Sequence, residues 1–484
     1  MLGLDSKRRA CDRCYTGKER CIWNYGTDAC DRCRRLQHLC STARPLMKVG
    51  RRPHQGPPHT SLHRSRQHTG LSSSAQTSYS TSPPSVRSHN AHLASTSAPE
   101  QTLSLFPTLD SNDKLLFELL IVRTRFIDRF LLGPSFTKVQ QQAIITRLHE
   151  ALPLLKDAYL SCAAFEIAED SIQSAGLTAD ACYEKAASAV STLRAIEIRD
   201  AKDVSICLSL GLATVTFAIL VGRGAAFSIS RHTLGLIKPA YVSTSMIMDL
   251  DSLAFLICLI ETETIECLLR HKSPTLRFKM PNFDFVDRYL GLSSPLLMHI
   301  YDICELTEAL SLAGGIQVSQ IMEKLSDIER KVDDWQPSPP SDFMTTYTQT
   351  EIVHILAQAE ILRSTVLLII HRLRSPFGAD IEKAISLSKA IVRSFDQVYI
   401  ITNKHIRCMA FSFMVAAFEV SDPNDRLRAL NKMNDTVGFS SSAKERTKQL
   451  LTSFWRAVDT HAGLYWYNLG DHLDMFSGET IILF

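Results

Sequence analysis

Residues 10–40 read ACDRCYTGKERCIWNYGTDACDRCRRLQHLC, and the fold of the N-terminal part of the chain depends on them. The pentapeptide ACDRC occurs at residues 10–14 and again at residues 29–33. Each copy continues as Cys-x2-Cys-x6-Cys, so the stretch consists of two related halves, for which we predict a pseudo-twofold arrangement. The cysteines that recur in register are Cys11, Cys14, Cys21, Cys30, Cys33 and Cys40.

The number of cysteines suits a pair of zinc ions that share ligands. Structural zinc takes four ligands in tetrahedral geometry. If each half bound its own zinc ion, three thiolates would leave that ion one ligand short. Two ions can each have four ligands if two of the six thiolates bridge both ions. The symmetric choice of bridges is the first cysteine of each half, Cys11 and Cys30. Asp12 and Asp31 follow them, where a carboxylate suits the positive end of a short helix.

A redox or metal-storage cluster is the alternative interpretation of the same cysteines, because Cys-x2-Cys is also a redox motif. Redox motifs do not need the third cysteine of each half, and they leave the surrounding Lys and Arg residues unexplained. A module with so small a core is expected to gain most of its folding energy from the metal.

The stretch resembles the DNA-binding module of the fungal binuclear zinc-cluster (Zn2Cys6) transcription factors. That module places a helix in the major groove. The resemblance implies two Zn²⁺ ions sharing six cysteine thiolates. It also implies double-stranded DNA with G-rich triplets of the CGG type as the partner, because Lys and Arg pair with guanine O6 and N7. Lys18 falls at the leading base-reading position, and Arg20 is next. The implied DNA-contacting residues are Lys18, Arg20, Arg13, Arg34, Arg35, Arg51 and Arg52.

Charge and composition divide the chain into three zones. Residues 1–53 carry 13 Lys and Arg against 5 Asp and Glu, and this basic head indicates a polyanionic partner. Residues 54–102 hold 12 Ser, 6 Thr, 5 Pro and 6 His with one aromatic residue, so we predict a disordered linker. Residues 103–484 have helical periodicity. The predicted fold is a small Zn2Cys6 module of two short helices with loops, a disordered linker and a large all-α regulatory domain.

Apolar periodicity places several helices in this third zone. Residues 204–222 form the best membrane candidate, but their near-minimal length and their Ser and Thr content favour a buried core helix. The Pro-rich residues 337–340 are expected to separate two lobes or to form a surface loop. Residues 372–378 (RLRSPFG) are the part of this zone most similar to the family. The predicted apolar helices are at 114–132, 321–335, 381–399 and 450–465, with Pro295 and Pro423 in first helical turns.

The sequence gives little support for an enzyme, a secreted protein or a membrane protein. It contains neither a Gly-x4-Gly-Lys phosphate loop nor His-Glu-x2-His nor Gly-x-Ser-x-Gly. No apolar signal core follows Met1. The four histidines on helical patterns are interpreted as interior or boundary residues rather than ligands: His299, His354, His371 and His461.

These observations predict a nuclear, sequence-specific DNA-binding regulator of RNA polymerase II transcription. The family implies metabolic or secondary-metabolite gene clusters as targets and transcriptional co-regulators as partners. Clean heptads are missing between residues 41 and 105, so monomer and homodimer both stay open. The alternatives are a zinc-dependent protein-interaction module that does not itself read DNA, and an enzyme targeted by a zinc-binding head.

Overall fold

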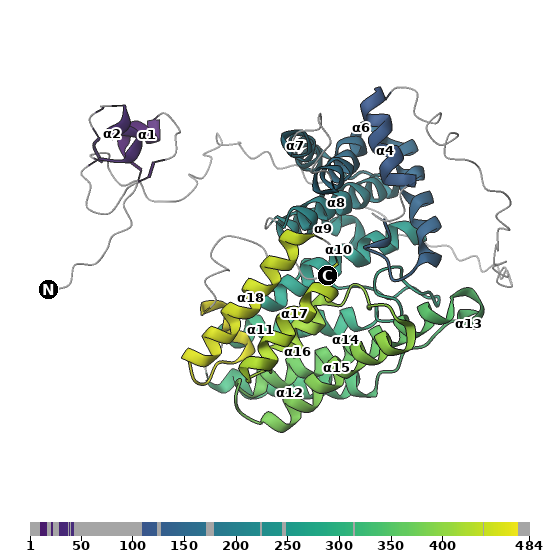
Figure 1. Cartoon of the computed structure of the whole chain (residues 1–484), viewed down its shortest axis with the longest axis vertical. Helices are drawn as coiled ribbons and strands as arrows, with labels where there is room; N and C mark the ends of the chain where they lie inside the picture. Colours follow the sequence, from purple (N-terminus) through teal and green to yellow (C-terminus); the bar gives the residue numbers. More distant parts are fainter. Residues whose placement is uncertain are drawn as a thin grey trace, which may run out of the picture. The chain divides into compact units, whose positions relative to one another are not determined.

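A computed structural model describes residues 10–16, 21–22, 29–36, 38, 40–42, 109–122, 127–170, 179–222, 225–243, 248–312, 315–438 and 440–472 (Figure 1). The chain divides into two compact units, Met1–His92 and Leu93–Phe484. The linker predicted over residues 54–102 lies outside the described residues. Across the described ranges the structure is largely helical, and its β pairing is limited to an isolated bridge between Asp287 and Gly291.

The second unit begins with a group of helices arranged around α8. Helix α6 contacts α4, α7 and α8, and α8 also contacts α9 and α10. Their bounds are α4 (Ser111–Val122), η1 (Pro134–Phe136), α6 (Thr137–Asp170), α7 (Ala179–Ala195), α8 (Ala201–Val221), α9 (Ala226–Ser243) and α10 (Leu250–Arg270).

A second group of helices in the same unit is arranged around α14, which contacts α11, α12, α15 and α16 (Figure 1). Helix α11 also contacts α10, and α18 contacts α8, so one hydrophobic core runs through both groups. The bounds are α11 (Leu296–Leu312), α12 (Gly315–Asp334), α13 (Phe343–Thr346), α14 (Gln349–Arg374), α15 (Ile381–Thr402), α16 (Ala410–Ala417), α17 (Pro423–Thr436), α18 (Ser441–Thr460) and η2 (Trp466–Asp471).

Helix α8 is buried along nearly its whole length. Asp200 caps its first turn by accepting a hydrogen bond from the Asp203 N–H at 2.9 Å, and Gly222 ends it with a φ of 66°. Helices α8 and α14 are both long and apolar enough to cross a membrane by length and composition, yet both lie mostly inside the protein. This burial agrees with the core-helix interpretation of residues 204–222.

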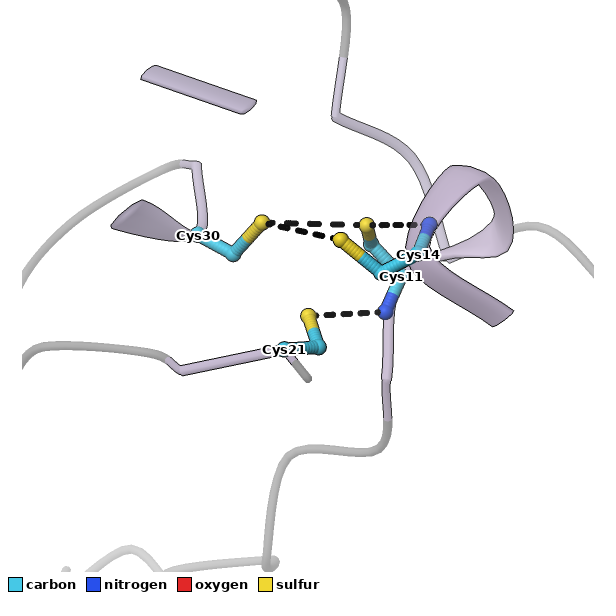
Figure 2. A group of neighbouring side chains, drawn as sticks. All are labelled: Cys11, Cys14, Cys21 and Cys30. Carbon is cyan, nitrogen blue, oxygen red and sulfur yellow. Dashed lines mark hydrogen bonds between the residues drawn. The ribbon is translucent and has the colours of Figure 1, made fainter. Parts of the chain in front are cut away.

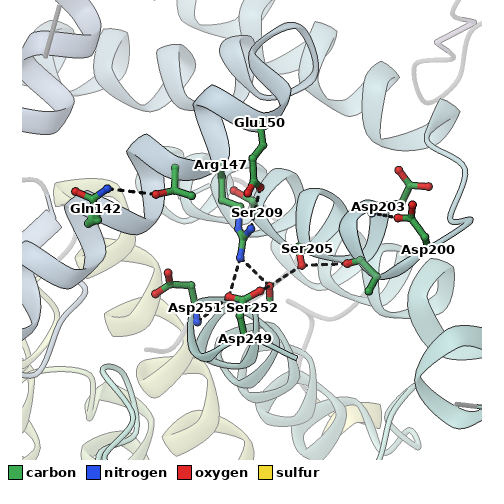
Figure 3. Close-up of polar contacts among 12 residues, drawn as sticks. Gln142, Arg147, Glu150, Asp200, Asp203, Ser205, Ser209, Asp249, Asp251 and Ser252 are labelled. Atoms are coloured by element: carbon green, nitrogen blue, oxygen red, sulfur yellow. Dashed lines mark hydrogen bonds and ion pairs between the residues drawn. The ribbon is translucent and has the colours of Figure 1, made fainter. Parts of the chain in front are cut away.

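A polar network connects α6 to the N-terminal ends of α8 and α10 (Figure 3). Arg147 of α6 donates to Asp249 at 2.7 Å and to Ser252 at 3.1 Å, and it also pairs with Glu150. Ser252 donates in turn to Ser205 of α8 at 2.8 Å. Because buried polar groups are costly without partners, this network favours one relative position of the three helices.

A second polar contact joins the end of α14 to the segment after α16. Arg372 is 1% exposed, and its Nε and Nη2 atoms donate to the Glu419 carboxylate at 2.7 and 2.6 Å. Its Nη1 atom donates to the carbonyl oxygens of Pro376 and Ala379 at 2.7 and 2.8 Å. The guanidinium also lies 5.1 Å from the centre of the Phe377 ring. Residues 372–378 are therefore folded around this guanidinium.

The predicted helical stripe at 321–335 is confirmed as far as Val332 in α12, whose apolar face packs into the core, whereas Trp335 lies just after the end of the helix and is half-buried. The buried residues of this face are Ile321, Leu325, Ile328 and Val332. The stripe at 381–399 is only partly right, because Ile381 and Tyr399 at its ends are 49% and 44% exposed. Helix α15 instead buries the face made by Ala384, Ser388, Ile391, Phe395 and Val398.

Two predicted helices are shorter than expected. Helix α18 ends at Thr460, so His461 is an exposed cap residue rather than part of a buried stripe. Helix α4 ends at Val122, residues 123–126 lie outside the described part, and residues 129–133 form turns and bends. The Gly133–Pro134 pair accounts for the end of this break, since proline restricts the residue before it and Gly133 is extended, with φ −169° and ψ 169°.

The proline and histidine predictions have mixed outcomes. Pro423 occupies the first turn of α17 after the Asp422 cap, whereas Pro295 lies just before α11. Residues 337–340 form a loop between α12 and α13. Among the histidines, His354 and His371 are buried and hydrogen-bonded, as predicted for interior residues.

Candidate metal centre and nucleic-acid interface

The two halves of the cysteine-rich unit each begin with a short helix, α1 (Asp12–Thr16) and α2 (Asp31–Arg35). Each helix starts directly after the first cysteine of its half. The sulfur of that cysteine accepts a hydrogen bond from the backbone N–H three residues later, at 3.4 Å in α1 and 3.5 Å in α2. The first cysteine therefore acts as a helix cap, and the acidic residue after it lies at the positive helix end.

The contacts of the first half recur in the second half 19 residues later. The Cys11 N–H donates to the Cys21 sulfur at 3.3 Å, and the Cys30 N–H donates to the Cys40 sulfur at 3.3 Å. The Asp12 N–H donates to the Ser41 carbonyl at 2.8 Å. Its counterpart in α2 donates to the Ile22 carbonyl at 2.9 Å. The sequence repeat is thus also a repeat of backbone and sulfur contacts.

The six sulfur atoms lie in two groups of four that have two members in common. Cys11 and Cys30 belong to both groups, and their sulfur atoms are 3.8 Å apart. Within each group the sulfur atoms are all within 4.8 Å of one another. Figure 2 shows the group formed by Cys11, Cys14, Cys21 and Cys30, with the sulfur atoms facing a common centre. The other group consists of Cys11, Cys30, Cys33 and Cys40.

The thiols of this cluster differ in their acidity. Burial raises the pKa of Cys21 to about 12 and also raises the pKa of Cys14 and of Cys40. Burial acts in the same direction on Cys30, but the backbone N–H of Cys33 and the neighbouring thiols lower the pKa of Cys30 to about 6. Four thiolates this close repel one another strongly, so they can all ionise only beside a cation. The donor set therefore fits a thiophilic dication such as Zn²⁺.

The structure describes some of the predicted DNA-contacting residues. Arg13 of α1 and Arg35 of α2 are exposed. Arg34 is also exposed, and its guanidinium is hydrogen-bonded to Asp31 at 2.6 Å. Of the predicted DNA-contacting residues, these three arginines are the ones that the structure describes. Lys18, Arg20, Arg51 and Arg52 lie outside the described residues.

One residue of the cluster was missed from the sequence. Ser41, just after the last cysteine, donates its hydroxyl to the Asp12 carboxylate at 2.7 Å and receives the Asp12 N–H at its carbonyl. It thereby joins the end of the second half to the start of the first. The signal was available, because Ser41 stands at the position of the second half that Ile22 occupies in the first.

Comparison with known proteins gives two matches. The model of the fungal specific transcription factor domain matches residues 231–478, which is about half of the chain. Over 41 residues the chain is 51% identical to a C6 finger transcription factor, traC, of Penicillium crustosum. That alignment covers 8% of this chain and 10% of the relative, so the chain spans a small part of the relative's length. No solved structure matches the chain.

Proposed function

The chain belongs to the fungal Zn2Cys6 transcription factors, and we propose that it acts in the nucleus by binding duplex DNA through a zinc-dependent six-cysteine module. Its targets are genes transcribed by RNA polymerase II, and the family implies metabolic or secondary-metabolite clusters among them. The helical unit has the regulatory role. Transcription factors are generally not enzymes, and we propose no catalytic activity.

The observation that carries this proposal is the pair of four-sulfur groups with shared members. One zinc ion is assigned to Cys11, Cys14, Cys21 and Cys30. The second zinc ion is assigned to Cys11, Cys30, Cys33 and Cys40. Bound zinc would cross-link the two halves and neutralise most of the thiolate charge, and the arginines of α1 and α2 offset the remainder.

The DNA contacts follow from the position of the cations around this cluster. Lys18 is the leading base-reading residue, and Arg20 is the next, with a guanine-rich triplet of the CGG type as the target. Arg13, Arg34 and Arg35 are exposed on α1 and α2, where they suit phosphate contacts. Arg51 and Arg52 extend the basic segment beyond the cluster. Phosphate contacts add affinity and salt dependence, whereas the base contacts supply the sequence preference.

The metal assignment is tested by native mass spectrometry of the full chain and of single cysteine variants. We expect two zinc ions in the unmodified chain. Cys11→Ser and Cys30→Ser should lose more zinc than Cys14→Ser or Cys33→Ser, because each bridging thiolate serves both ions. The control is Cys182→Ser, in α7, which should retain both ions. Equal losses at all six positions would contradict the bridging assignment, and one zinc ion or none would favour the redox alternative.

The DNA assignment is tested by selecting bound sequences from a randomised duplex library with the zinc-loaded chain. We expect an enriched triplet, and single or paired triplets would distinguish a monomer from a homodimer. Lys18→Ala should abolish the enrichment while both zinc ions stay bound. Arg13→Ala should weaken binding to all sequences and reduce the salt slope by about one. Two bound zinc ions without enrichment would favour the protein-interaction module over a DNA reader.

A further inference from the structure

The helical unit contains a cavity of about 710 Å³ that the DNA-binding proposal does not use. Its wall comes from four segments that are far apart in the sequence, at residues 129–134, 348–354, 404–408 and 435–438. Small-molecule sites in proteins commonly have volumes of about 300–1,000 Å³. The cavity is therefore large enough for a metabolite-sized ligand.

Two of the charged groups around the cavity are already engaged in protein contacts. The Glu351 carboxylate accepts hydrogen bonds from the N–H and hydroxyl of Ser135, at 2.7 Å each, and from the N–H and hydroxyl of Thr348, at 2.9 and 2.8 Å. Arg129 makes a two-point ion pair with Glu166 at 2.8 and 2.5 Å. The Glu351 carboxylate keeps its negative charge but its oxygen atoms already accept four hydrogen bonds, and the Arg129 guanidinium is already paired.

The cations still available lie on the segment that joins α15 to α16. Lys404 is exposed, and its ammonium group makes no hydrogen bond or ion pair within the described part of the chain. Arg407, which also lines the cavity, uses its Nη1 atom to donate to the Asp128 carbonyl, and its other nitrogen atoms make no hydrogen bond or ion pair with the described residues. The available acid is Asp435, at an exposed position of the wall. With Arg129 paired to Glu166, the two cations Lys404 and Arg407 balance the two acids Glu351 and Asp435, but both cations lie on one segment of the wall.

A buried histidine also lies in the wall of the cavity. His354 is 5% exposed, lines the cavity and shares a hydrogen bond with the Thr402 hydroxyl at 3.0 Å. Burial lowers the pKa of His354 to about 4, and the charges of Arg407 and Lys404 act in the same direction, whereas the Glu351 carboxylate opposes them. The imidazole is therefore neutral at neutral pH and adds no charge to the cavity.

The remainder of the wall is largely apolar, with Leu132, Pro134 and Ile406 among its members. Gly438 lies in the wall, and a Cβ atom placed on it would have no atom within 4 Å. The space in front of this glycine is open. The wall therefore combines an apolar surface with two cations from a single segment.

We propose that this cavity binds a small organic anion with an apolar body, such as an aromatic or aliphatic carboxylate or sulfonate. The anionic group pairs with Lys404 and Arg407, and the apolar body lies against the Leu132, Pro134 and Ile406 wall. Hydrogen bonds from these two cations give the site its preference for an anion. This site does not depend on the zinc cluster or on DNA binding.

The probe that tests this proposal is anilinonaphthalene sulfonate, whose fluorescence reports binding, titrated into the full-length chain. N-phenylnaphthylamine has the same rings without the sulfonate and serves as the uncharged comparison. We expect the sulfonate to bind saturably and more tightly than the amine. The double variant Lys404→Gln with Arg407→Gln should lower the sulfonate affinity by about tenfold or more and leave the amine affinity unchanged.

A second variant blocks the cavity without changing its charge. Gly438→Phe fills the open space and should reduce the binding of both probes. The matched controls are Gly235→Phe, on the exposed side of α9 where a Cβ also meets no atom within 4 Å, and Lys389→Gln, an exposed lysine of α15. Both controls should bind the sulfonate like the unmodified chain. Equal affinities of the two probes, full sulfonate affinity in the double variant, or unchanged binding by Gly438→Phe would each overturn the proposal.

Discussion

Replacing Arg372 by Met should strongly destabilise the helical unit. The substitution preserves much of the side-chain volume but removes the guanidinium that lies between Glu419 and the Pro376 and Ala379 carbonyls. Glu419 is 6% exposed on its side chain, so its charge would be left buried without a cation. Breaking one side of a buried ion pair costs about 3–5 kcal/mol, and we expect a loss of unfolding free energy in that range.

Urea unfolding followed by circular dichroism at neutral pH measures this loss, and the fluorescence of the buried Trp455 and Trp466 gives a second signal. Adding Glu419→Met to Arg372→Met removes the uncompensated charge. The double variant should therefore recover about 2 kcal/mol, although the two carbonyls still lack a donor. The control is Arg330→Met, which breaks an exposed pair and should cost less than about 1 kcal/mol. A loss below about 1 kcal/mol for Arg372→Met, or no recovery in the double variant, would refute this account.

Three further predictions concern packing, pH and metal. Gly211→Ala should lower the free energy of unfolding in urea by about 1–3 kcal/mol, because its Cβ would lie 2.4 Å from the buried Thr233 side chain of α9. Adding Thr233→Ala should restore much of this lost stability. A double variant as unstable as Gly211→Ala would contradict the clash. Burial raises the pKa of Asp287 from 3.8 to about 6, so the folded carboxyl holds its proton more tightly than the unfolded one. The contribution of Asp287 to stability should fall by about 3 kcal/mol as pH rises from about 4 to about 6 and then level off. Thermal unfolding at several pH values measures this loss, and Asp287→Asn should lack this pH-dependent part of the stability. Zinc chelation should abolish binding to the selected DNA while the helical circular dichroism signal of the second unit persists; loss of most of that signal would show that the helices depend on the metal.

Sequence periodicity predicted best those helices whose whole apolar face is buried. In α12 every position of the stripe from Ile321 to Val332 packs into the core, so local spacing and tertiary burial agree. In α15 the core contacts only the middle of the helix, and Ile381 and Tyr399 extend beyond it. Apolar spacing gives the orientation of a helix face, but it does not give the length over which other helices cover that face.

The cysteine-rich unit was more predictable than the helical unit because its contacts are local and repeated. A cysteine that caps a helix, an acidic residue after it and a sulfur acceptor ten residues later all follow from one half-motif. The partner of Asp12 was not predicted, because Ser41 belongs to the opposite half and carries no cysteine signal of its own.

The cavity could not have been predicted, because the contacts that occupy its polar groups join distant residues. The Thr348-x2-Glu351 pattern is a local capping box that begins α14. Its second role appears only in the fold, where the same carboxylate accepts two hydrogen bonds from Ser135, 216 residues earlier in the chain. Gly133 permits this approach, since a Cβ there would lie 2.3 Å from the Glu351 carboxylate. The oxygen atoms of an acid that appears free in the sequence are thus occupied by its own helix and by a distant turn, and Lys404 and Arg407 are the cations left to contact a ligand.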